Sequence, residues 1–264
     1  MTKQISTVVS QEALEVLKES YPVEAGYNKI ILPRLGLISQ DKTEGKGKSM
    51  KVIAEAGMFF TEVQTEEKDE DGKTIWKKDE IGTDTEVIIL YQRKQLKLYD
   101  EATEKYTSSP IYDTDDEVLP LFCDKKEITR GTPADLKEKY KYTDKTGKVK
   151  SALEDNRILY VLKDGVAYQM NLRGSSMYSF LTYSRKILPP AVVTKLSSEA
   201  KEKGEIAWNQ MTFTKVRDIT AEEAVDVTAK VKEIKFAVEA EKAQYAKPNQ
   251  KIDELDAYGN EAMK

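Results

Sequence analysis

RILYVLKDGVAYQMNL, residues 157–172, is the stretch that decides the fold. Apolar and aromatic residues fill its two halves, 157–162 and 166–172, and Asp164-Gly165 stands near the middle. Asp-Gly is favoured in the two-residue turns that join antiparallel strands, because those turns require positive φ. The stretch therefore predicts a β-hairpin.

Further strands are predicted on both sides of this hairpin. Residues 85–99 pass from an apolar run into alternation of polar and apolar residues, and residues 206–216 alternate throughout. Residues 50–63 and 74–77 flank a charged loop that contains Asp71-Gly72, and they predict a second hairpin. The middle of the chain is thus expected to be mostly β-structure.

Two segments before these strands have a weaker pattern. Residues 29–39, KIILPRLGLIS, are apolar but contain Pro33 and Gly36. This composition suits a bent or edge strand better than a central one, because proline donates no hydrogen bond to a ladder. The Gly- and Lys-rich residues 41–48 predict a flexible loop.

Helices are predicted where an N-cap residue precedes apolar positions spaced three or four apart. The predicted helices, each with its cap, are 10–19 (Ser10), 133–140 (Thr132), 177–187 (Ser175 or Ser176) and 220–246 (Thr220, in a capping box with Glu223). Together with the strands they define a β-rich α+β class, for which a small twisted sheet or barrel is an economical closure. We expect one domain over residues 1–246 and a flexible tail over 247–264.

The residue inventory excludes much enzymology. The chain of 264 residues has no histidine and one cysteine, Cys123, so it lacks the commonest general base and any Cys-His nucleophile pair. Residues 113–117 carry four carboxylates but not the spacing of a calcium loop, and residues 45–48, GKGK, do not fit a P-loop frame. We therefore expect a protein that is not an enzyme, with no cofactor and no metal.

Charge and hydropathy indicate a cytoplasmic protein. The formal net charge is −4, and no apolar stretch approaches the roughly 18 residues that would mark a membrane span. The first residues lack the apolar core of a signal peptide.

Basic and aromatic residues alternate in two windows that lie mainly on predicted strands. Residues 165–198 and 87–99 contain no acid. Such windows suit single-stranded nucleic acid, since cations neutralise phosphates while aromatic faces stack on unpaired bases. The candidate binding residues are Tyr91, Arg93, Lys94, Lys97, Tyr99, Tyr168, Arg173, Tyr178, Tyr183, Arg185 and Lys186, and Trp76 and Trp208 either join them or lie in the core.

Each of these residues also has an ordinary structural interpretation. Tyrosine has a high strand propensity, and lysine solubilises the outer face of a sheet. Gly174-Ser175-Ser176, which follows Arg173, offers backbone N–H groups and hydroxyls that would suit a phosphate, but simple N-capping explains the same residues.

LYVLKDGVAYQMNLRGSSMYSFLTY (159–183), ILPRLGL (31–37) and AGMFF (56–60) together resemble single-stranded DNA-binding proteins of tailed bacteriophages. This resemblance implies an oligonucleotide-binding (OB)-like antiparallel β-barrel with loop and helix insertions. It also implies a role in phage DNA replication or recombination, with an acidic tail that recruits partners. Residues 251–264 depart from that pattern, because they lack a dense acidic run and a terminal phenylalanine.

The sequence thus predicts a non-enzymatic protein that coats single-stranded DNA, in the host cytoplasm if a phage encodes it. Replication or recombination proteins are expected partners, and the C-terminal helix is a candidate surface for homo-oligomer formation; no membrane association is expected. The alternative is a phage structural or assembly protein without nucleic-acid binding, which would form stable assemblies in the absence of DNA. A metal-dependent nuclease is disfavoured, since no clean carboxylate motif is present.

Overall fold

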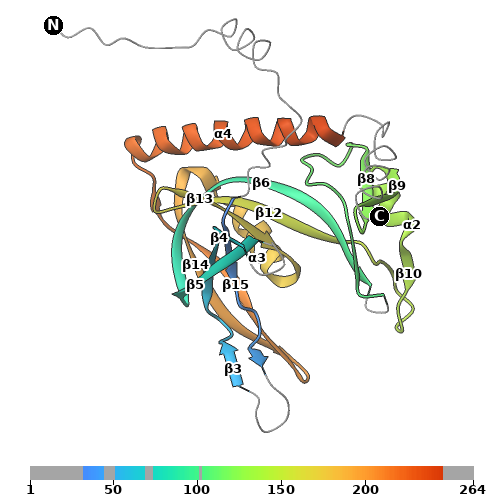
Figure 1. Cartoon of the computed structure of the whole chain (residues 1–264). Helices are drawn as coiled ribbons and strands as arrows, with labels where there is room; N and C mark the ends of the chain where they lie inside the picture. The colour runs from blue at the N-terminus through green and yellow to red at the C-terminus, as the bar shows by residue number, and fades with distance from the viewer. Residues whose placement is uncertain (1–31, 45–50, 69–73, 101–102, 246–264) are drawn as a thin grey trace, which may run out of the picture. The chain divides into compact units, whose positions relative to one another are not determined.

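The computed structural model describes residues 32–44, 51–68, 74–100 and 103–245, and all of these belong to one compact unit (Figure 1). The predicted helix at 10–19 and the tail at 247–264 lie outside the described residues. The described part is mostly β-structure with three α-helices and a 3-10 turn.

The strands, in chain order, are β1 (Arg34–Leu37), β2 (Lys42–Glu44), β3 (Lys51–Ala54), β4 (Phe59–Lys68), β5 (Thr74–Gly82), β6 (Asp84–Asp100), β7 (Lys105–Ser108), β8 (Leu119–Cys123), β9 (Lys126–Gly131), β10 (Lys141–Thr143), β11 (Val149–Ser151), β12 (Glu154–Lys163), β13 (Val166–Leu172), β14 (Val192–Lys203) and β15 (Ile206–Asp218). The helices are α2 (Pro133–Lys139), α3 (Gly174–Ser184), η2 (Pro189–Ala191) and α4 (Ala221–Tyr245).

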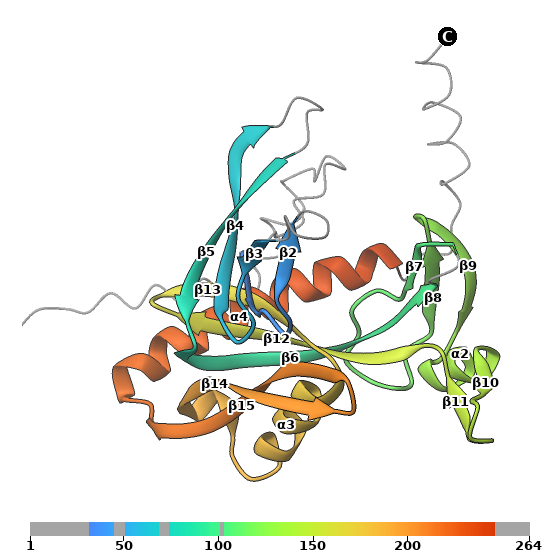
Figure 2. The same cartoon turned by 90° about the horizontal axis from the view of Figure 1, so that it is seen from below.

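β6 is the centre of the large sheet. One of its edges pairs with β12, and the path continues through β13, β1, β4 and β5. Its other edge pairs with β14 in the N-terminal part and with β7 in the C-terminal part. The sheet therefore forks at β6 into a β14–β15 branch and a β7–β8–β9 branch (Figure 2).

The sheet curls strongly, but it does not close. The backbone N–H of Asn209 in β15 donates to Ser39 O, at 2.7 Å, just after β1, and Gln40 Nε2 donates to Ala207 O at 3.0 Å. No strand ladder joins β15 to β1 within the described ranges, and β1 runs parallel to β13. The β-rich α+β class is confirmed, whereas the predicted antiparallel barrel is replaced by an open, mixed sheet in the described part.

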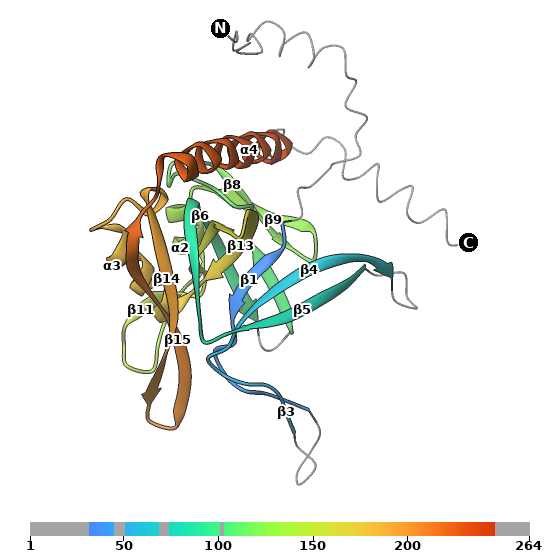
Figure 3. The same ribbon diagram turned by 90° about the vertical axis from the view of Figure 1, so that its left-hand side faces the viewer.

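A helix covers each face of this sheet (Figure 3). α3 closes the larger core, which we call core 1; α4 closes core 2 on the opposite face; and α2 closes a small core 3 at the end of the β7–β9 branch. Core 1 contains Leu35, Phe59, Val87, Ile89, Leu159, Val161, Met170, Leu172, Met177, Phe180, Tyr183, Val192, Leu196, Met211 and Phe213. Core 2 contains Ile88, Leu90, Ile158, Tyr160, Val193, Val227, Ile234 and Val238.

Both predicted hairpins are confirmed, as β12–β13 and β4–β5. The predicted capping boxes or caps of α2 and α4 are also present: Thr132 Oγ1 accepts from the Asp135 N–H, and Thr220 Oγ1 accepts from the Glu223 N–H. Two local predictions are wrong: β1 lies inside the sheet, and part of 41–48 forms β2. The strands β7 to β11 and β14 were not predicted.

The cap of α3 also differs from the prediction. Arg173 occupies the N-cap position and makes no side-chain cap bond, while Ser175 and Ser176 lie inside the first turn. Ser175 Oγ accepts from Trp208 Nε1 at 3.1 Å, and Ser176 Oγ accepts from the Met211 N–H at 2.9 Å. The two hydroxyls therefore attach α3 to β15 instead of capping the helix.

An ion-pair network fixes α4 to the sheet. Asp113 Oδ1 accepts from Arg93 Nε at 3.0 Å and from Tyr91 Oη at 3.2 Å, and Asp113 Oδ2 pairs with Lys242 Nζ of α4. The guanidinium also donates to Ile111 O at 2.6 Å. Burial raises the pKa of Asp113, but the hydrogen bonds and positive charges of Lys242 and Arg93 outweigh it, so the pKa lies below its usual 3.8.

We expect Asp113→Ala to lower the free energy of unfolding by about 3–5 kcal/mol, because the buried Arg93 then loses its carboxylate. Since the folded-state pKa of Asp113 is depressed, this stabilisation is present above the unfolded pKa and is lost as pH falls through the folded pKa. Urea denaturation at neutral and acidic pH measures both effects. The matched control is Asp115→Ala, whose 70%-exposed carboxylate pairs with Lys94 in a contact worth about 1 kcal/mol or less; equal losses in the two variants would contradict the network's importance.

Candidate nucleic-acid interface

The α4 side of the sheet continues beyond core 2 as a polar surface, which we call the polar face. Side chains of directly paired residues share one face of a sheet, and the register carries this face across seven strands, β1, β4, β5, β6, β7, β12 and β13. Lys97 pairs with Glu154 and Ser108, and Tyr99 pairs with Tyr106. The polar face comprises Arg34, Phe60, Glu62, Gln64, Trp76, Lys78, Glu80, Gln95, Lys97, Tyr99, Tyr106, Ser108, Glu154, Asn156, Gln169, Asn171 and Arg173.

Three cations are the central feature of the polar face. Lys97 is half-buried, and within the described ranges its ammonium has no hydrogen-bond or ion-pair partner. Burial lowers the pKa of Lys97, and the positive charges of Arg34 and Arg173 lower it further. Arg173 is exposed and likewise has no ion pair among the described residues. The cluster therefore concentrates positive charge that the described chain only partly neutralises.

Three acidic side chains, those of Glu62, Glu80 and Glu154, share the polar face with four cations, so they cancel its positive charge only in part. Arg34 pairs with Glu62 at 3.2 Å, an exposed contact in which the arginine keeps more than half of its side chain accessible. Glu154 is exposed beside Lys97 in the ladder. An anion that approaches Lys97 and Arg173 would thus meet cations already held close together by the sheet.

Aromatic rings flank the cations at both ends of the polar face. Tyr99 and Tyr106 lie with ring centroids 4.6 Å apart, and they are 46% and 65% exposed. At the other end, Arg34 lies over the Trp76 ring at 4.9 Å, and Lys78 lies over Phe60 at 4.4 Å. Exposed rings beside cations are the combination that single-stranded nucleic acid requires.

Glycine at position 36 permits one of these aromatic contacts. A Cβ built there would lie 2.6 Å from the Phe60 ring, so the ring rests directly on the β1 backbone. Arg34 and Gly36 share this face because Leu35 faces core 1 and successive side chains alternate. Arg34, Tyr106 and the aromatic residue Phe60 were not among the predicted site residues, although the alternation in RLGL was a signal that Arg34 points away from the core.

The residues of the first predicted window take three different positions: on the polar face, in the network around Asp113 on the same side of the sheet, and on the opposite side. Lys97 and Tyr99 lie on the polar face, whereas Tyr91 and Arg93 belong to the network around Asp113. Arg93 is 1% exposed. Lys94 points to the opposite face, where it pairs with Asp115 at 2.6 Å.

The second window is split as well. Arg173 reaches the polar face, but Tyr168 packs against core 1, and Tyr183 lies within it with its hydroxyl 2.7 Å from Thr194 Oγ1. Tyr178, 66% exposed, and Lys186 line a groove beside α3. The remaining residue, Arg185, is exposed at the C-terminal end of α3, and Trp208 is half-buried against Ser175.

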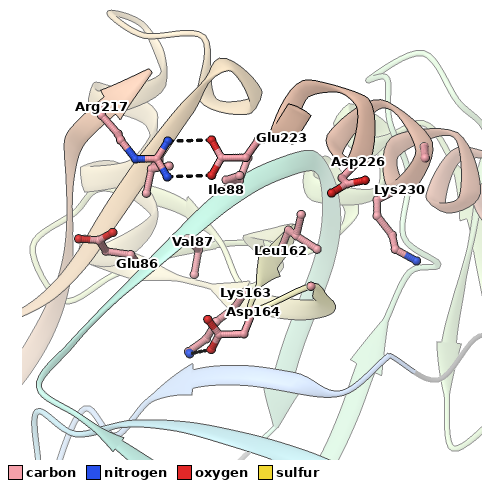
Figure 4. Close-up of a pocket in the computed structure, with 13 residues that line it drawn as sticks. Glu86, Val87, Ile88, Leu162, Lys163, Asp164, Arg217, Glu223, Asp226 and Lys230 are labelled. Atoms are coloured by element: carbon pink, nitrogen blue, oxygen red, sulfur yellow. Dashed lines mark hydrogen bonds and ion pairs between the residues drawn. The ribbon is translucent and has the colours of Figure 1, made fainter. Parts of the chain in front are cut away.

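A cavity of about 540 Å³ lies between α4, the β12–β13 hairpin and β14 (Figure 4). Its apolar residues include Ile88 and Val193 from core 2. The three cations at its rim are already paired: Lys163 with Asp164, Lys230 with Glu233, and Arg217 with both carboxylate oxygens of Glu223 at 2.7 Å, which lowers the pKa of Glu223 to about 2. The cavity therefore offers less free positive charge to a phosphate than the polar face does.

No group of three or more metal-ligating side chains occurs in the described ranges. No helix there is long and apolar enough to cross a bilayer. Comparisons with protein-family models, with curated proteins and with solved structures gave no match to this chain.

We expect Lys97→Met to leave the free energy of unfolding unchanged or to raise it by up to about 1 kcal/mol at neutral pH and low salt. The substitution removes a half-buried charge that two arginines repel. Urea denaturation measures this, with Lys94→Met as the control that loses an ion pair. A loss of more than about 1 kcal/mol in Lys97→Met would mean that the ammonium stabilises the fold.

Proposed function

We propose that this protein binds single-stranded DNA on the polar face, without catalysis, and coats it during replication or recombination. The observation that carries the proposal is the arrangement of Lys97, Arg34 and Arg173 on one face of a sheet, with Lys97 unpaired in the described ranges. A phosphate bound there would supply the missing negative charge.

The polar face can hold both parts of a nucleotide chain. Phosphates would contact the three cations, and bases would stack on the Tyr99–Tyr106 pair and on Trp76. Amide side chains between them, such as Gln169 and Asn171, are able to donate and accept hydrogen bonds. Stacking on a ring requires an unstacked base, which favours single strands over a duplex.

The sheet of this protein presents such residues as the strands of an OB-like barrel would. OB-folds bind oligonucleotides across the exposed surface of a few strands. Here the central strands β6, β12 and β13 play the same part, and the β4–β5 hairpin extends the surface at one side (Figure 2). The likeness lies in the surface, since the described strands form an open sheet.

Binding to oligo-dT should weaken steeply with salt, with a slope of about −0.7 in log K against log salt for each phosphate contact. Lys97→Ala with Arg173→Ala should reduce this slope by about 1.4, because two contacts are lost. Fluorescence titration at several salt concentrations gives the slopes, and duplex DNA should bind more weakly.

The control for this titration is Lys201→Ala with Lys203→Ala, near the tip of the β14–β15 hairpin, which removes the same charge outside the polar face. An equal effect of the two double variants would indicate non-specific attraction. Absence of any single-strand binding at low salt would contradict the proposal. Stable assembly of the protein without DNA would then favour a structural or assembly role.

Tyr99→Ala should lower the affinity for oligo-dT by about 5- to 150-fold, which corresponds to about 1–3 kcal/mol for one stacked base. The matched control is Tyr142→Ala, because Tyr142 is 48% exposed on β10, away from the polar face. With Trp208→Phe as background, Trp76 is the remaining tryptophan and reports binding through fluorescence quenching. Equal affinity of Tyr99→Ala and Tyr142→Ala would exclude stacking on Tyr99.

A further inference from the structure

A second concave surface lies beside α3, at the edge of β15. It has a volume of about 580 Å³ and is lined by α3 residues on one side and by Gln210 and Phe213 on the other. This volume falls in the range of sites that bind small organic groups, about 300–1,000 Å³. We call it the α3 groove.

The floor of the α3 groove is aromatic, and polar groups without hydrogen-bond partners lie beside it. Phe213 and Tyr183, whose ring centroids are 5.9 Å apart, form its apolar part, and the exposed Tyr178 forms a wall. Among the described residues, the Gln210 amide and the Ser179 hydroxyl have no hydrogen-bond partner. A flat ring with hydrogen-bonding groups along its edge fits this combination.

Cations lie at both ends of the helix that forms the groove. Lys186 lines the groove beyond the C-terminal end of α3 and has no ion pair within the described part of the chain. Arg173 is the N-cap residue and also belongs to the polar face. Arg173 precedes Ser175, a residue that lines the groove, by two positions in the chain, so the polar face and the groove lie on either side of the start of α3.

We infer that the α3 groove is a nucleobase subsite that reads adenine through the Gln210 amide. The amide group of glutamine matches adenine, because its oxygen accepts from N6 and its nitrogen donates to N7. Tyr178 stacks on the base, and Lys186 contacts its phosphate. This inference rests on the proposed function, and it adds base preference to a surface that otherwise binds any sequence.

The test compares two unstructured oligonucleotides of about 12 nucleotides, within the usual site sizes: one alternates adenine and cytosine, and the other alternates thymine and cytosine. The wild-type protein should bind the adenine oligonucleotide at least about fivefold more tightly. Gln210→Leu should remove this preference and leave the affinity for the thymine oligonucleotide unchanged. Tyr178→Ala should weaken both complexes, because stacking does not depend on the base.

The matched control is Gln92→Leu, which removes an exposed amide on β6 that does not line the groove. Lys97→Ala should weaken both complexes by the same factor. If the wild-type protein binds both oligonucleotides equally, or if Gln210→Leu keeps the preference, the inference is wrong and the proposed function stands. If neither oligonucleotide binds at low salt, both are wrong. Circular dichroism of each variant checks that it is folded.

Discussion

The structure depends on one carboxylate, that of Asp113. It contacts the guanidinium of Arg93 on the central strand, and it reaches the ammonium of Lys242 near the end of α4. A buried arginine is tolerable only when it is paired and hydrogen-bonded. The segment between β7 and β8 is therefore held against β6, and the same carboxylate sets where the far end of α4 lies. The polar face begins where this network ends, two and four positions after Arg93 on β6, at Gln95 and Lys97.

Much of the secondary structure could be predicted because its signals are local. Asp164-Gly165 specifies a hairpin turn, and Thr220 with Glu223 specifies a helix start, whatever surrounds them. β14 was not predicted because the strand follows two prolines and its second half is charged. Its pairing with β6 and β15 depends on residues far away in the sequence. Ser175 and Ser176 were read as caps because the sequence does not show that β15 will offer them Trp208 and the Met211 N–H.

The same distinction explains the site. A window of sequence is continuous, but a strand sends successive side chains to opposite faces. Residues 91–99 thus contribute Lys97 and Tyr99 to one surface, while Lys94 lies on the other side of the sheet. Arg93 is buried in an ion pair with Asp113. Arg34, more than fifty residues before Lys97 in the chain, joins it because β1 was inserted between β4 and β13. That neighbourhood is set by strand order, which no local pattern encodes.

The attachment of α3 to β15 also protects a strand edge from pairing with a neighbouring molecule. An exposed strand edge is a template for unwanted pairing between molecules. Here the N–H groups of Asn209 and Met211 on the outer edge of β15 are occupied by Ser39 and Ser176, so this part of the edge cannot recruit a strand from a neighbour. At high local concentration, neighbouring copies of the protein are therefore not expected to pair their β15 strands along this part of the edge.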